Sequence, residues 1–186
     1  GKSAVQMQAD LEEMGFYVNV VTADAADPGT FWDYDLVILS SSDNTSTIEN
    51  ATLRDGLVAF AQEGGHILVE GGEVGYDAAS YPGYPAFAEH VLHSIDWNAD
   101  SAGNVTVADS EAYILNNPNP SCTPIAITYD GYGDSDAMAP LADAAMPMNW
   151  SEYADDASVI TYDPNSAPEG GQIVYFCWNY LAADQG

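Results

Sequence analysis

The amino-acid sequence predicts an α/β fold, a three-layer sandwich around a mainly parallel, doubly wound β-sheet. Short apolar runs typical of strands alternate with amphipathic helical patterns along the first hundred residues. Alternation at this spacing implies right-handed crossovers and parallel strands. The run at 35–40 is continuously apolar, as in parallel strands that are buried on both faces. The 186 residues suit one domain, 1–186, with a sizeable core.

The first predicted element is a helix whose apolar residues recur at helical spacing. Ser3 and Gln6 fit a capping box at its start, and Gly15 ends it. Residues 16–21 are rich in aromatic and β-branched side chains, which predicts a strand. The buried strand at 35–40 follows after a polar loop.

A second capping box, formed by Ser46 and Glu49, predicts the start of the next helix. The glycine pair at 64–65 ends this helix and leads directly into a short buried strand at 66–69. The sequence therefore predicts a compact helix-to-strand unit in the middle of the chain.

The second half of the chain is less regular. Pro85 suits the first position of a helix. Residues 104–108 predict a strand, and 109–150 are loop-rich. Two closing strands are predicted at 158–163 and 172–178, the second continuous, aromatic and therefore buried.

The predicted order opens with a helix, whereas a doubly wound sheet normally opens with a strand. We expect that the missing opening strand lies upstream in a larger protein, or that another chain supplies it. The first alternative is favoured because exposed sheet edges are usually protected. In either case an open edge or slot would be a receptor for an added strand.

The charge balance is extreme. The chain has 29 acidic residues against Lys2 and Arg54, for a formal net charge of −27. Such a surface repels nucleic acid and anionic membranes and attracts cations. No apolar run is long enough to span a bilayer, so no membrane insertion is expected. The acidity predicts a salty or calcium-rich medium and an extracellular or cell-surface location.

Two features bear on processing in such a location. Cys122 and Cys177 allow one disulfide, although the sequence does not show that they meet. Four sequons permit N-glycosylation, but a chain rich in Asn, Ser and Thr is equally expected to contain them by chance. The sequons begin at Asn44, Asn50, Asn104 and Asn149.

The stretch after the strand at 66–69 carries the first candidate site. Its glycines allow a sharp turn, and sites in open α/β sheets lie beyond the carboxyl ends of the strands. Glu73 stands at the tip of this turn, where a hydrolase of this architecture would carry Ser or Cys. Glu70 and Asp77 are close by, and paired carboxylates can act as acid and base on glycans. Acidic residues are so abundant, however, that clustering by chance is expected.

A second candidate is a cation site. Asp130, Asp134 and Asp136 lie on a glycine-rich loop, and such carboxylates suit calcium. The spacing is not that of an EF-hand, so an acidic turn without an ion is the alternative. His90 and His93 have a spacing that could hold a metal, but no third ligand accompanies them, which favours structural histidines. Apart from Ca²⁺, no cofactor is expected.

Taken together, four stretches resemble class I glutamine amidotransferase-like domains, which have a flavodoxin-like fold. These stretches are 35–40, the run 64–77 (Gly-Gly-His-Ile-Leu-Val-Glu-Gly-Gly-Glu-Val-Gly-Tyr-Asp), 131–137 (Gly-Tyr-Gly-Asp-Ser-Asp-Ala) and 170–176 (Gly-Gly-Gln-Ile-Val-Tyr-Phe). The resemblance is strongest to the non-catalytic versions found in secreted bacterial surface proteins. Catalytic members have Gly-x-Cys-x-Gly at the turn and a late His-x-Glu, whereas this chain has Glu73 at the turn and no histidine after His93.

The resemblance therefore implies a non-catalytic structural or binding domain of an extracellular or cell-surface assembly, acidic and calcium-stabilised. Its partners would be other subunits or domains of that assembly, joined in one variant through an added strand. The alternative is a carboxylate-dependent hydrolase acting on glycans, with Glu70, Glu73 and Asp77 as its catalytic groups.

Overall fold

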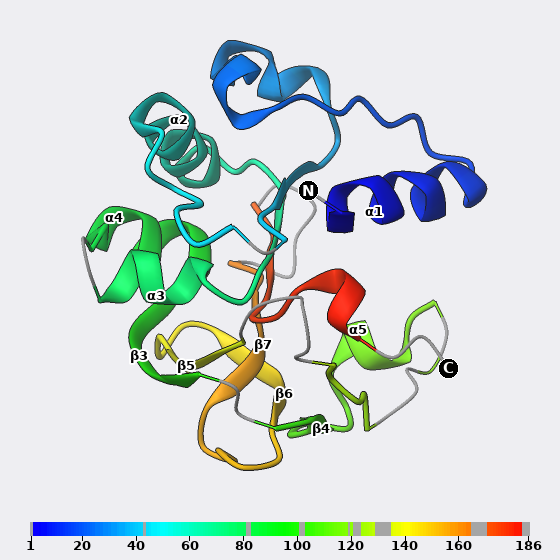
Figure 1. Cartoon of the computed structure of the whole chain (residues 1–186), viewed down its shortest axis with the longest axis vertical. Helices are drawn as coiled ribbons and strands as arrows, with labels where there is room; N and C mark the ends of the chain where they lie inside the picture. Colours follow the sequence, from blue (N-terminus) through cyan, green and yellow to red (C-terminus); the bar gives the residue numbers. More distant parts are fainter. Residues whose placement is uncertain are drawn as a thin grey trace.

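Helices cover both faces of a central β-sheet in the computed structural model, which describes residues 2–42, 44–80, 83–100, 103–118, 120, 124–128, 135–164 and 171–183. Figure 1 shows α2, α3 and α4 on one side of the sheet and α1, η4 and α5 on the other. The elements are α1 (Lys2–Glu13), η1 (Ala23–Ala25), η2 (Pro28–Asp33), β1 (Val37–Ser40), α2 (Ala51–Gln62), β2 (Ile67–Glu70), α3 (Val74–Ala79), α4 (Pro85–Phe87), η3 (Ala88–Leu92), β3 (Ser94–Asp100), β4 (Val105–Val107), α5 (Tyr113–Asn116), β5 (Asp136–Pro140), β6 (Ala145–Trp150), β7 (Ala157–Tyr162), β8 (Ile173–Phe176) and η4 (Tyr180–Ala182).

The sheet among the described residues has eight strands, in the order β1-β2-β8-β7-β5-β3, with β6 paired to β7 and β4 paired to β6. Pairing is parallel between β1 and β2 and between β2 and β8. All the other pairs are antiparallel. The predicted α/β fold class is confirmed, with a mixed sheet in which parallel pairing is confined to three strands. A short connection joins β6 to its neighbour β7, and such a connection allows only antiparallel pairing.

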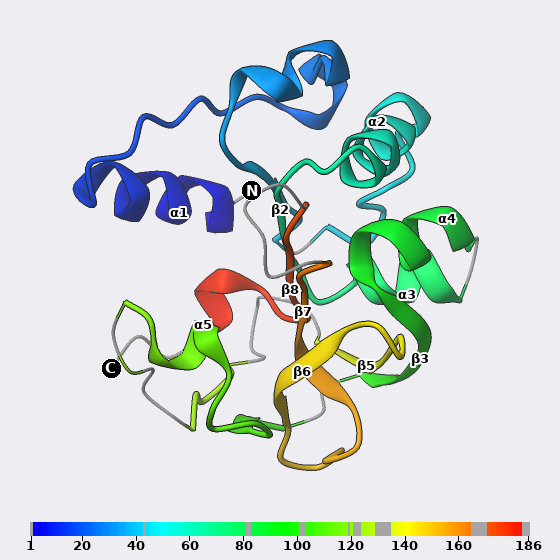
Figure 2. The ribbon, with the colours of Figure 1, turned by 180° about the vertical axis from the view of Figure 1, so that it is seen from behind.

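The core extends from the helices around α2 across the parallel strands to Trp150 of β6 and Ala182 of η4. Leu57 of α2, Val69 of β2 and Tyr175 of β8 are fully buried. Seen from behind in Figure 2, the strands β2, β8 and β7 again separate these helices from α1 and η4. Among the described residues, no helix has both the length and the apolar composition needed to cross a bilayer.

The two helices predicted in the first half of the chain form, but neither predicted capping box does. The helix α1 begins at Lys2, and the Ser3 hydroxyl is buried without a hydrogen-bond partner among the described residues. The helix α1 ends as predicted at Gly15, whose φ of +94° favours glycine. The predicted capping box of Ser46 and Glu49 is wrong, because α2 begins after Asn50. The Asn50 side chain accepts a hydrogen bond from the Leu53 N–H at 3.1 Å and is the N-cap.

The strand predicted at 16–21 is wrong. These residues are extended but pair with no strand among the described residues, and most of them are exposed. Their β propensity has no effect here because a strand needs a neighbouring strand to satisfy its backbone groups.

The loop-rich prediction for 109–150 is wrong in part, since β5 and β6 lie within it. The strand β6 is not predicted from the sequence because it contains Pro147, and proline is rare inside sheets except at bulges. The structure places Pro147 in a register shift between Ala145 and Met148. The bulge removes the need for the amide that proline lacks.

Candidate functional site

The candidate site is the turn at 71–75, where β2 passes into α3 beyond the carboxyl ends of the parallel strands. Gly71 has a φ of +145°, and a Cβ at this position would clash with the Ser41 side chain. A Cβ on Gly75 would clash with Met138. Glycine is therefore required at Gly71, whereas a Cβ at Gly75 would displace the end of the Met138 side chain and approach the Asp136 carboxylate.

Glu70, the last residue of β2, is fully buried and hydrogen-bonded at both carboxylate oxygens. Oε1 accepts from the Ser40 hydroxyl and from the Ser42 N–H at 3.1 Å, and Oε2 accepts from the Tyr180 N–H at 2.8 Å. Burial raises the pKa of Glu70, and these hydrogen bonds partly oppose the rise. Glu70 therefore ties together β1, β2 and the chain after β8, with its oxygens turned inward.

Asp136, the first residue of β5, forms a second buried carboxylate centre behind the turn. Its Oδ2 accepts from the Gly75 N–H at 2.8 Å and from the Tyr175 hydroxyl at 3.1 Å. Its Oδ1 is buried without a hydrogen-bond partner among the described residues. Burial raises the pKa of Asp136 well above its ordinary value, while the Gly75 and Tyr175 bonds act in the opposite direction.

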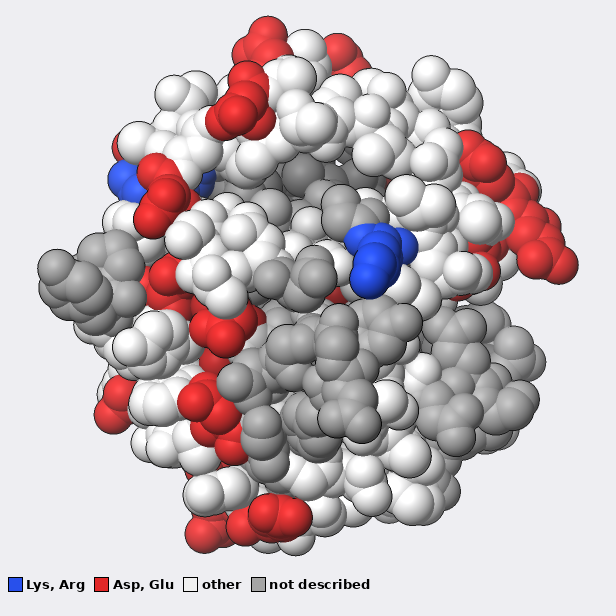
Figure 3. Space-filling view, in the orientation of Figure 1, with Lys and Arg blue, Asp and Glu red and all other residues white. Residues whose placement is uncertain are grey.

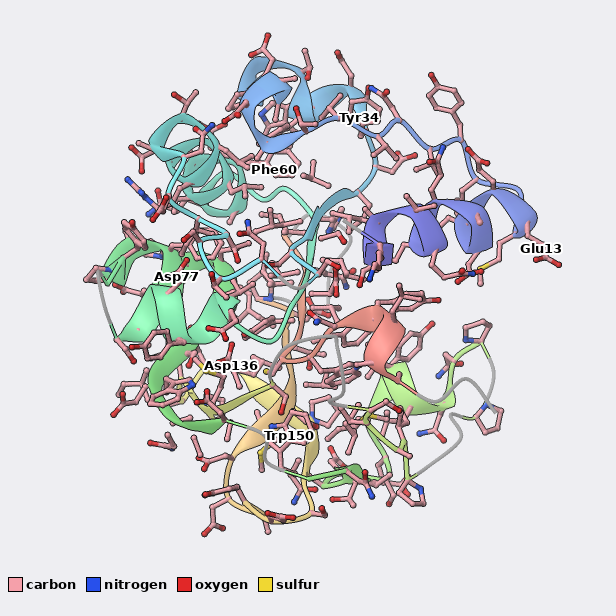
Figure 4. The ribbon with its side chains drawn as sticks, viewed as in Figure 1. Glu13, Tyr34, Phe60, Asp77, Asp136 and Trp150 are labelled. Carbon is pink, nitrogen blue, oxygen red and sulfur yellow. The ribbon has the colours of Figure 1, made fainter. Side chains whose placement is uncertain are left out.

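Asp77 and Asp136 lie on different sides of α3, as Figure 4 shows. Asp77 is buried toward the loop before α2, where the N–H groups of Thr47 and Ile48 donate to it. Its Oδ2 has no hydrogen-bond partner in the described part of the chain. Burial raises the pKa of Asp77. Its neighbours thus differ entirely from those of Glu70 and Asp136.

Glu73 is the residue at the tip of the turn, as predicted. It immediately precedes α3, is half-buried, and makes no hydrogen bond that caps the helix. Its charge raises the pKa of Asp136. Of the predicted trio, Glu73 alone is partly exposed, because Glu70 and Asp77 point into separate parts of the interior.

The fold has counterparts among solved structures. The chain is similar to a beta-galactosidase from Rahnella sp. R3, with 19% identity and a TM-score of 0.62 over 94% of this chain and 23% of that one. A cytoplasmic protein from Salmonella typhimurium has 15% identity and a TM-score of 0.60 over 91% of this chain and 72% of that one. A ThuA-like protein from Bacteroides uniformis ATCC 8492 has 14% identity and a TM-score of 0.58 over 97% of this chain and 75% of that one.

The chain has the class I glutamine amidotransferase-like fold. At these identities the likeness concerns the fold alone. No family model and no curated protein matches the sequence. The chain spans less than a quarter of the beta-galactosidase, at 23% of its length.

The thiol required by catalytic domains of this fold is not found at the turn. Cys177 lies just after β8, is fully buried and forms no disulfide with any described residue. Burial and the nearby Asp136 raise the pKa of the Cys177 thiol well above its ordinary value, which disfavours a reactive thiolate. Cys122 lies outside the described residues, so the predicted disulfide stays a prediction.

The predicted cation sites have no support in the described part of the chain. Asp130 and Asp134 lie outside it, and Asp136 points into the interior toward Gly75 and Tyr175. No group of three or more metal-ligating side chains occurs among the described residues. His93 stacks on the Tyr162 ring at 3.6 Å between centroids and is buried, as a structural histidine would be.

The predicted glycosylation asparagines fall into two classes. Asn44 and Asn104 are exposed. Asn50 caps α2, and Asn149 accepts from the Thr106 hydroxyl at 2.6 Å and donates to the Ala154 carbonyl at 2.8 Å. A glycan is attached to the side-chain nitrogen, so it would disturb the hydrogen bonds that Asn50 donates to the Ala23 carbonyl at 3.3 Å and that Asn149 donates to the Ala154 carbonyl.

The structure forms a polar hollow away from the turn, at the start of α2. No residue of the turn at 71–75 lines it, so it offers no substrate cleft for Glu73. Its lining residues are Ala23, Asp24, Asn44, Ser46, Thr47, Glu49 and Asn50.

Sequence reasoning missed two residues of the buried centre behind the turn. Tyr175 was predicted only as part of an apolar strand, and Asp136 only as a calcium ligand. The signal for Tyr175 was its hydroxyl, because a phenol in a buried strand requires a hydrogen-bond partner.

Proposed function

We propose that this chain is a non-catalytic domain that binds other subunits or domains of a larger assembly. The observation that carries the proposal is that the carboxylates at and behind the turn point into the domain and bind groups there. Both oxygens of Glu70 and one oxygen of Asp136 accept hydrogen bonds from within the domain. These groups fix the turn in place, which is a structural role.

The residue types at the turn also favour this proposal. Acyl transfer needs a nucleophile with an adjacent base, such as a thiol beside a histidine. The tip of the turn carries Glu73, and Cys177 is buried with a raised pKa. The likeness to 23% of a beta-galactosidase is compatible with one domain of a longer protein.

An extracellular or cell-surface location is part of the same proposal. It rests on the net charge of −27, which ions in a salty or calcium-rich medium would screen. The exposed sequon asparagines Asn44 and Asn104 are compatible with such a location. Calcium would bind at Asp130 and Asp134.

The alternative, hydrolysis of glycans, depends on Glu73 because it is the most accessible carboxylate of the trio. Retaining and inverting glycosidases need two carboxyl groups that flank one scissile bond. Glu70 and Asp77 have different buried surroundings, so neither is placed to act as a partner of Glu73 on a common substrate.

The decisive experiment compares the wild-type chain with Glu73→Gln on panels of glycan and amide substrates. Glu63→Gln is the matched control, because Glu63 is an exposed residue at the end of α2 and loses the same charge. We expect no turnover by any of the three proteins. Turnover by the wild type and Glu63→Gln that is abolished in a normally folded Glu73→Gln would refute the proposal.

A further inference from the structure

Exposed large apolar side chains are concentrated before β1. Nine of the fourteen such side chains among the described residues precede Val37. Four of them belong to the extended segment 16–21, where Phe16 is 62% exposed and Tyr17 is 87% exposed. Segment 16–21 therefore presents exposed apolar side chains of the kind that interaction surfaces contain.

The strand next to these residues, β1, is an open edge of the sheet. Within the described part of the chain, β1 pairs only with β2. The Val37 N–H donates to the His66 carbonyl at 3.0 Å and the Ser41 N–H to the Glu70 carbonyl at 2.9 Å. Backbone groups alternate between the two sides of a parallel strand, so those of Ile38 point to the open side.

The opposite edge of the sheet, β3, has the features that protect edges from pairing. Its pairing with β5 is interrupted by two register shifts, and it carries Asp96 and Asp100. Bulges and charged side chains are the usual means of blocking an edge. The strand β1 has neither, because its sequence is Val-Ile-Leu-Ser and its register with β2 is continuous.

The extended segment 16–21 is held near β1 by a side chain instead of a backbone ladder. The Asn19 side chain donates to the Tyr34 hydroxyl at 2.7 Å, and Tyr34 lies three residues before β1. Figures 1 and 2 show this segment running back above α1 toward η1, apart from β1. It has the composition of a strand and lacks a partner.

We infer that the open edge of β1 receives an extended apolar strand from a partner polypeptide, and that segment 16–21 covers the outer side of that strand. This inference rests on the proposed function as a domain of an assembly. The incoming backbone would pair with the open side of β1 at about 4.8 Å, as neighbouring strands do. Its side chains would cover the apolar residues that are now exposed.

Charge decides which partner is favoured. A second copy of this chain would bring another net charge of −27 to the interface, and like charges oppose such pairing. Figure 3 shows acidic side chains at the far end of α1 and over the η1 and η2 region, on either side of segment 16–21. The favoured partner therefore has an apolar strand flanked by Lys or Arg.

The inference can be tested with a dye-labelled peptide of alternating valine and isoleucine that has lysines at both ends. Fluorescence anisotropy would measure its binding to the full chain, with a glutamate-flanked peptide and a proline-interrupted peptide as controls. We expect binding of the first peptide, weaker binding of the second and none of the third. Bound peptide should also slow hydrogen exchange at the Ile38 amide.

Substitutions in the chain localise the binding. Ile38→Lys should weaken peptide binding about tenfold or more, because an inserted charge blocks an edge. The double variant Phe16→Ser/Val20→Ser should also weaken it, and both of these residues are exposed, so folding is not at risk. Ile95→Lys is the matched control, because Ile95 is exposed on the opposite edge strand β3.

The inference fails if the lysine-flanked peptide does not bind, or if Ile95→Lys weakens binding as much as Ile38→Lys. It also fails if the isolated chain dimerises with protection of the Ile38 amide, because the occupant would then be a second copy. The proposed function is tested separately by turnover. Loss of peptide binding without any turnover would overturn this inference alone.

Discussion

Asp136 offers the most direct test of the buried carboxylates as structural groups. Asp136→Ala leaves the Gly75 N–H and the Tyr175 hydroxyl without their acceptor in a fully buried place. Each unsatisfied buried donor costs about 1–3 kcal/mol. Relief of the desolvation of the carboxyl offsets part of this sum. We expect a net loss of about 2–5 kcal/mol, similar to breaking a buried pair by removing one partner.

Asp136→Asn separates the hydrogen bonds from the charge. Its carbonyl oxygen can still accept from Gly75 and Tyr175, so the loss of stability should be smaller than in Asp136→Ala. Because the raised pKa of Asp136 means that the folded state keeps its proton to higher pH, stability falls as pH rises from about 3.9 to the folded pKa. In this window the slope reaches about 1.4 kcal/mol per pH unit, and the Asn variant should lack that contribution.

The assay is urea unfolding at a series of pH values, for the wild type, both variants and Asp155→Asn as an exposed control. Glu70 and Asp77 also have raised pKa values, so part of the pH dependence should remain in Asp136→Asn. Equal stability of Asp136→Ala and Asp155→Asn would refute the reasoning. A pH dependence unchanged in Asp136→Asn would show that this carboxyl does not titrate as burial requires.

Three further predictions concern the turn, the thiol and the charge. Gly71→Ala should destabilise the fold more than Gly15→Ala in thermal unfolding. Both glycines have a positive φ, but a Cβ at Gly71 also clashes with the Ser41 side chain, whereas a Cβ at Gly15 has no described atom within 4 Å. In a Cys122→Ser background, Cys177 should react with a thiol reagent only after unfolding, and reaction in the folded state at the rate of an exposed thiol would contradict its burial. Sodium chloride should raise the melting temperature of a chain with a net charge of −27, because salt screens self-repulsion; a decrease from low to moderate salt would count against this.

The central strands could be predicted from the sequence because local pattern and tertiary context agree there. The run at 66–69 is apolar, follows a glycine pair and precedes glycines, and β2 forms at Ile67–Glu70. Segment 16–21 has an equally clear strand composition but no strand beside it, so propensity alone was misleading. For β6 the prediction fails in the opposite sense: a strand forms where a loop is predicted, because a bulge accommodates Pro147.

The position of Glu73 at the tip of the turn could be predicted because the surrounding glycines define the turn. The environment of each carboxylate could not, since burial depends on contacts made across the sheet. Asp136 illustrates this limit: its spacing from Asp134 suggested a cation site, whereas its contacts are with Gly75 and with Tyr175, 39 residues further along the chain. Residue type indicated that a partner was needed, and only the fold determined which partner.

The same contacts explain why binding is a better hypothesis than catalysis for this domain. A general acid or base must reach the proton that it transfers, at a hydrogen-bond distance from the substrate. Both oxygens of Glu70 are already used by Ser40, Ser42 and Tyr180, so catalysis there would require breaking bonds that hold three segments together. The open backbone groups of β1 carry no such cost, because a partner strand would satisfy them without displacing any described strand.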